Sequence, residues 1–88
     1  MDQDKKNVIS LSEMDVNTEG IIHKLEGGAA FQSRLQALNI RTGKRIKKIS
    51  ANPFRGPIVV EVDSSRVAIG YGMAQKVMVE TATREKPS

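Results

Sequence analysis

Apolar residues occur along most of the chain in short alternating runs, the pattern of strands with one buried face. These runs predict strands at residues 18–25, 44–51, 58–63, 66–69 and 76–80. One stretch has a different period: Phe31, Leu35 and Leu38 lie at i, i+4 and i+7, which predicts an amphipathic helix over residues 29–38. The chain is therefore expected to be mainly β with one short helix.

The alternation also predicts which side chains share a face of each strand. In residues 18–25, Ile21, His23 and Leu25 share one face by parity. In residues 44–51, Ile46 and Ile49 have opposite parity, so both can face the core only if the strand contains a bulge or a strong twist.

The connections carry recognisable turn residues. Asn39 suits the left-handed position after a helix, and Ile40 is expected to fold back on the last helical turn. Thr42-Gly43 predicts a turn, and residues 52–57, N-P-F-R-G-P, predict a loop. Residues 70–74, G-Y-G-M-A, allow one short helical turn.

The domain is expected to span residues 11–80. Residues 1–10 and 81–88 are polar, without a clear period, and are predicted to be flexible tails. Leu11 and Met14 are expected to tuck onto a barrel. Five or six short strands and one helix fit an SH3-like barrel best, with an OB-type barrel as the alternative, and strand spacing does not separate the two.

Composition excludes several classes of protein. The chain has 88 residues and no cysteine, so it has no disulfide and no thiolate ligand, which fits a reducing cytosol. Its apolar runs are too short to cross a membrane. His23 is the one histidine, and no nucleophile or phosphate-loop motif is present. We therefore predict no enzyme, no catalytic residue, no cofactor and no intrinsic high-affinity metal site.

Charge is unevenly distributed. The formal net charge is +4, and the block R-T-G-K-R-I-K-K, residues 41–48, predicts a positive face that includes Lys47 and Lys48. The stem of Lys48 is expected to lie along the barrel with its ammonium in water. Nucleic acid is a disfavoured ligand of this face, because only Phe54 and Tyr71 remain as base-stacking residues.

Partner binding has three further candidate residues. Phe54 and Arg55 occupy the proline-bracketed loop, and Tyr71 lies between two glycines. Aromatic residues and arginine are enriched at the energetic centres of protein interfaces. The alternative for Phe54 is that it folds over the end of the barrel as a lid on the core. Self-association through free edge strands is a further expectation.

Two segments carry a family resemblance. The segment R-L-Q-A-L-N-I-R-T-G, residues 34–43, and the segment V-A-I-G-Y-G-M-A-Q-K-V-M-V, residues 67–79, flank the proline and glycine loop. In this order they resemble the ferrous iron transport protein A family of small SH3-like domains. Asn39 and Thr42 depart from the usual glycine and proline of the family, but both suit the same turn.

The resemblance implies a function that composition does not. It implies a cytoplasmic accessory of ferrous iron uptake whose partner is a membrane iron transporter with a cytosolic GTP-binding domain. The SH3-like domains of metal-dependent repressors are similar too, so a relative of such a domain standing alone is a second implication. Phe54, Arg55, Tyr71, Lys47 and Lys48 are the residues expected to contact the partner.

Overall fold

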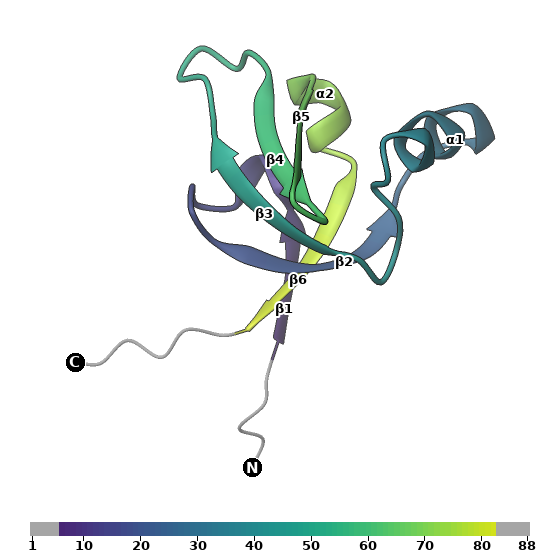
Figure 1. Ribbon diagram of the computed structural model, residues 1–88, viewed down its shortest axis with the longest axis horizontal. Coiled ribbons are helices and arrows are strands. Elements are labelled where there is room, and N and C mark those ends of the chain that lie inside the picture. Colours follow the sequence, from purple (N-terminus) through teal and green to yellow (C-terminus); the bar gives the residue numbers. More distant parts are fainter. Residues whose placement is uncertain (1–5, 83–88) are drawn as a thin grey trace.

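A single antiparallel sheet of six strands makes up most of the protein in the computed structural model, which describes residues 6–82. The strands lie in the order β1-β6-β2-β3-β4-β5 and curl into a small barrel (Figure 1). The elements, with η1 a 3₁₀ turn, are β1 (Lys6–Ser10), η1 (Leu11–Glu13), β2 (Glu19–Leu25), α1 (Ala29–Ala37), β3 (Arg45–Ser50), β4 (Ile58–Val62), β5 (Ser65–Ile69), α2 (Tyr71–Ala74) and β6 (Val77–Ala82).

The N-terminal boundary of the domain differs from the prediction. Residues 6–10 form β1, which pairs antiparallel with β6 from Lys6 opposite Ala82 to Ser10 opposite Met78. The predicted tail is therefore wrong for these residues, because pairing with β6 supplies the order that their own sequence pattern does not indicate. β6 likewise continues past Glu80 to Ala82. The remainder of both predicted tails lies outside the described residues.

A bulge in β2 changes which of its side chains face the core. The pairing of β2 with β6 shifts between Ile22 and Lys24. Such an inserted residue lets two positions of opposite parity point the same way. Ile22 and Leu25 are accordingly buried, whereas Ile21 and His23 are exposed. The expectation that Ile21, His23 and Leu25 share one face is therefore wrong, because the bulge turns Leu25 to the core and leaves the other two side chains exposed.

The expected irregularity in β3 is confirmed. The pairing of β3 with β4 shifts between Lys48 and Ser50. Ile46 is fully buried and Ile49 is half-buried, so both apolar side chains are at least partly covered despite their opposite parity.

The end of α1 has the predicted cap. Asn39 has a φ of 69°, its N–H donates to the carbonyl of Gln36, and the N–H of Ile40 donates to the carbonyl of Leu35, both at 2.9 Å. This is the Schellman arrangement, and it folds the buried Ile40 back onto the helix. Leu35 is buried as predicted, but Leu38 is 36% exposed and contributes less to the core.

The core lies inside the barrel. Its residues come from η1, α1, α2 and every strand from β2 to β6, and β1 adds the partly buried Ile9. The buried apolar side chains are Leu11, Met14, Ile22, Leu25, Leu35, Ile40, Ile46, Ile58, Val60, Val62, Ile69, Ala74, Val77 and Val79. Burial of Leu11 and Met14 confirms that the segment before β2 tucks onto the barrel.

Lys48 is buried inside this core, contrary to the prediction. Only 3% of the residue is exposed. Its Nζ donates to the carbonyl oxygens of Leu11, Ser12 and Met14 at 3.0, 3.1 and 2.6 Å. Three acceptors require three N–H groups, which only the charged ammonium has. The stem does run along the barrel, but the turn at η1 supplies carbonyls in place of the water expected around the ammonium.

Burial has a measurable electrostatic consequence. It lowers the pKa of Lys48 from its ordinary value of 10.5, and the negative charge of Asp15 opposes that shift. The three carbonyls therefore compensate a real desolvation cost, since a buried charge is tolerated only when its hydrogen bonds are made.

Removing the ammonium is expected to loosen the N-terminal turn. Lys48→Met leaves three carbonyl oxygens without their donor, so the free energy of unfolding should fall by about 2 kcal/mol. Lys47→Met is the matched control, because its side chain lies on the outer face, and it should change stability by less than about 0.5 kcal/mol. Urea unfolding of both variants measures the difference. Equal midpoints would contradict the role of Lys48.

Candidate partner-binding surface

The loop between β3 and β4 presents Phe54 to solvent. Phe54 is 89% exposed, so it does not form the lid that was its alternative. The side-chain oxygen of Asn52 accepts a hydrogen bond from the N–H of Phe54 at 2.8 Å. The carbonyl of Asn52 accepts another from the N–H of Arg55 at 3.1 Å. These bonds order the loop around its exposed aromatic residue.

Arg55 connects this loop to α2. Its guanidinium carbon lies 5.7 Å from the centre of the Tyr71 ring, within the range of a cation–π contact. Tyr71 begins α2, whose first turn closes through hydrogen bonds from Met73 and Ala74 to the carbonyl of Gly70. The loop and α2 lie toward the same end of the barrel (Figure 1). We call residues 52–57 together with Tyr71 the aromatic loop surface.

The structure separates the two lysines from this surface. Lys48 is buried and cannot contact a partner, so its prediction as a binding residue was wrong. Lys47 is half-buried on the outer face of β3, between Glu19 of β2 and Glu61 of β4. Of the five expected residues, only Phe54, Arg55 and Tyr71 gather at one end of the barrel.

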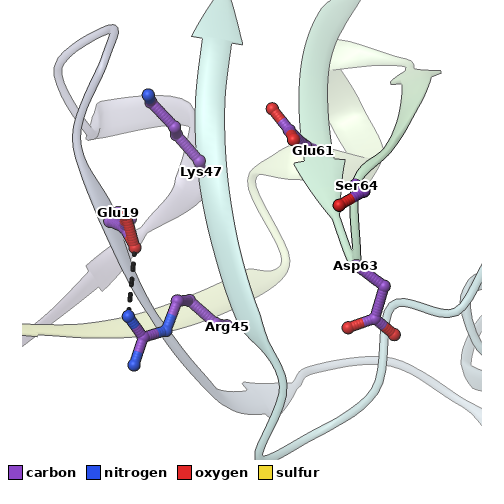
Figure 2. A pocket seen from close by; sticks show the side chains of 6 residues that line it. All are labelled: Glu19, Arg45, Lys47, Glu61, Asp63 and Ser64. Atoms are coloured by element: carbon purple, nitrogen blue, oxygen red, sulfur yellow. Dashed lines mark hydrogen bonds and ion pairs between the residues drawn. The ribbon is translucent and has the colours of Figure 1, made fainter.

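The outer face around Lys47 carries alternating charges. Cross-strand pairing places Glu19, Lys47, Glu61 and Arg66 side by side on β2, β3, β4 and β5. We call this row the charge ladder. Most of it, together with Arg45, Asp63 and Ser64, lines a shallow hollow (Figure 2). Arg45 pairs with Glu19 at 3.5 Å, and Arg66 approaches Glu61 at 3.8 Å.

Asp63 binds a further residue of the basic block. Its carboxylate accepts hydrogen bonds from the Lys44 ammonium at 2.5 Å and from the Asn39 amide at 2.7 Å. The bond from Lys44, and after it the bond from Asn39, lowers the pKa of Asp63. The basic segment is therefore interleaved with carboxylates, which offset much of the positive charge that the sequence predicted for this face.

Neither a metal site nor a membrane span is evident in the described chain. Within residues 6–82, no three His, Cys, Asp or Glu side chains group closely enough to hold a metal ion. His23 lies exposed on β2. No helix in the same range has the length and apolar character needed to cross a bilayer.

The curled six-stranded sheet places the protein in the class of small antiparallel β-barrel domains. The FeoA domain family matches residues 9–81, nearly all of the described chain. The protein therefore belongs to the FeoA family, which is involved in Fe(2+) transport and is not a known family of enzymes.

Individual relatives agree with this assignment. A Methanocaldococcus jannaschii protein named "Putative Fe(2+) transport protein A" is 36% identical over 64 residues, covering 73% of this chain and 76% of its own. The crystal structure of an iron uptake regulatory protein, FeoA, matches with a TM-score of 0.80 and 34% identity, over 88% of this chain and all of that one. The predicted SH3-like fold is confirmed.

The similarity to repressors is also found, at the level of the fold. A manganese-dependent transcriptional repressor matches with a TM-score of 0.79 and 19% identity, over 88% of this chain and 43% of the repressor. The fold of the present chain is thus shared with part of that longer repressor.

The charge ladder was missed by sequence reasoning. Its members are far apart along the chain, and only the cross-strand pairing brings Glu19 and Arg66 into one row with Lys47. The basic residues of β3 were visible in the sequence, but the carboxylates that lie opposite them on β2 and β4 were not.

The pKa of Asp63 offers a direct check of the surface. In the wild type the pKa of Asp63 should lie below the ordinary value of 3.8. Lys44→Met should raise this pKa, because it removes the hydrogen bond that lowers it most. A lowered carboxyl pKa stabilises the fold above the unfolded pKa, and that stabilisation disappears as pH falls through the folded value. Carboxyl NMR titration measures this, with Lys47→Met as a control that leaves the Asp63 pKa unchanged.

Proposed function

We propose that this protein is a cytoplasmic accessory of ferrous iron uptake. Its partner is the cytosolic GTP-binding domain of the membrane iron transporter, and it acts by contact. Membership of the FeoA family supports the link to Fe(2+) transport. The aromatic loop surface is the part of the molecule that would make the contact.

The exposure of Phe54 carries this proposal. A phenylalanine that is 89% exposed leaves most of its apolar surface in water, and covering it is favourable. Arg55 follows Phe54 in the loop and lies over the ring of Tyr71, and both have side chains of the types that dominate interface energies. The Asn52 hydrogen bonds hold the loop in place before binding, which reduces the entropy lost on association.

Nucleic acid is less well supported as a partner. A surface that binds phosphates needs uncompensated positive charge. Here Lys44, Arg45 and Arg66 each pair with a carboxylate, and Lys48 is buried. The basic segment therefore offers phosphate little beyond Arg41 and Lys47.

Truncating Phe54 should weaken binding to the GTP-binding domain. An anchor side chain at an interface contributes about 2 kcal/mol or more, so Phe54→Ala should raise Kd by about 30-fold. Arg55→Ala should raise it by a smaller factor. Calorimetric titration with the isolated GTP-binding domain, in the presence of GDP or a GTP analogue, gives the numbers.

The control is Val8→Ala, which truncates another exposed apolar residue, on the edge strand β1. It should leave Kd within twofold of the wild type. Equal effects of Phe54→Ala and Val8→Ala would assign the contact to a different surface. A parallel titration with mixed single-stranded RNA should give no binding at physiological salt.

A further inference from the structure

The charge ladder has an order that fits a second copy of itself. Across β2, β3, β4 and β5 it reads acid, base, acid, base: Glu19, Lys47, Glu61, Arg66. Consider two copies that face each other across a two-fold axis parallel to the strands. The row of one copy then lies against the row of the other in reversed order. Glu19 then faces Arg66 of the second copy, and Lys47 faces Glu61 of the second copy.

A second row obeys the same rotation. Arg45 lies two residues from Lys47 on β3. Asp63 lies two residues from Glu61, just past the end of β4, toward the same end of the hollow as Arg45 (Figure 2). The rotation that matches the ladder also brings Arg45 opposite Asp63 of the second copy. A two-fold axis along the row would instead set each charge against itself. Of these two symmetric arrangements, the order of the charges therefore favours the one with its axis parallel to the strands.

We propose that this outer face is the contact between two copies of the protein. The ladder has no net charge, so it is a neutral patch on a chain whose formal charge is +4. Its end side chains are exposed, at 65% for Arg66 and 46% for Glu19, and Lys47 and Glu61 between them are half-buried. The ion pairs made by its members are long, at 3.5 Å from Arg45 to Glu19 and 3.8 Å from Arg66 to Glu61. Lys47 has no ion pair within residues 6–82.

Other occupants fit the face less well. A nucleic acid needs one sign of charge, and an apolar partner needs an apolar surface. Pairing of copies through the edge strands β1 and β5 would use backbone groups and would respond little to salt or to charge reversal. The contact proposed here consists of exposed charges, so it is weak and falls as ionic strength rises.

Complementary charge reversals test the arrangement. Lys47→Glu alone and Glu61→Lys alone each set like charges against one another across the axis, so each should weaken self-association by about tenfold or more. An equimolar mixture of the two variants restores every opposition and should associate as strongly as the wild type. The double variant should do so as well. Sedimentation equilibrium at low and high salt measures these four samples and the wild type.

A second pair uses the more exposed ends of the ladder and protects the test against misfolding. Glu19→Arg and Arg66→Glu should behave in the same way, weak alone and restored when mixed. Far-ultraviolet circular dichroism confirms that each variant is folded. The proposal is overturned if the wild type stays monomeric at millimolar concentration and low salt. It is equally overturned if a mixture of folded single variants associates no better than its components.

Discussion

The buried ammonium of Lys48 is the interaction on which the N-terminal half of the barrel depends. Its three acceptors, the carbonyls of Leu11, Ser12 and Met14, all belong to η1 or the residue after it. Through them β3 holds the turn that joins β1 to β2, and with it the buried side chains of Leu11 and Met14. In a domain of this size, an unpaired buried charge, or buried carbonyls that lose the ammonium as their donor, would cost a large share of the total stability.

Features set by local patterns could be predicted from the sequence, whereas features set by contacts between distant segments could not. The strands, the helix, the Asn39 cap and the bulge in β3 followed from local patterns, because turn chemistry and parity act over a few residues. The burial of Lys48 could not be predicted, since its partners lie more than thirty residues earlier in the chain. β1 was missed for a related reason: its order comes from pairing with β6.

The residues of the proposed binding surface also differ in how far the sequence revealed them. Phe54 and Arg55 were identifiable from residue type and from the prolines around them, and the structure brings Tyr71 to Arg55. The basic segment was misjudged, because a strand read alone shows its own charges and conceals those of its neighbours. Once Glu19 and Glu61 flank Lys47, a face that looked fit for phosphate becomes a face of balanced charge. The fold is shared with repressor domains, so function has to be argued from such surfaces.

The most direct test of the proposed role is an amide-resonance titration of the isotopically labelled protein with the transporter's GTP-binding domain. The account predicts shifts confined to residues 52–57 and 70–73, with the resonances of β1 and the charge ladder unchanged. Shifts centred on Lys47 and Glu61 would assign partner binding to the ladder. No shift at any residue, with a folded partner at high concentration, would contradict the claim that this protein acts by contact with that domain.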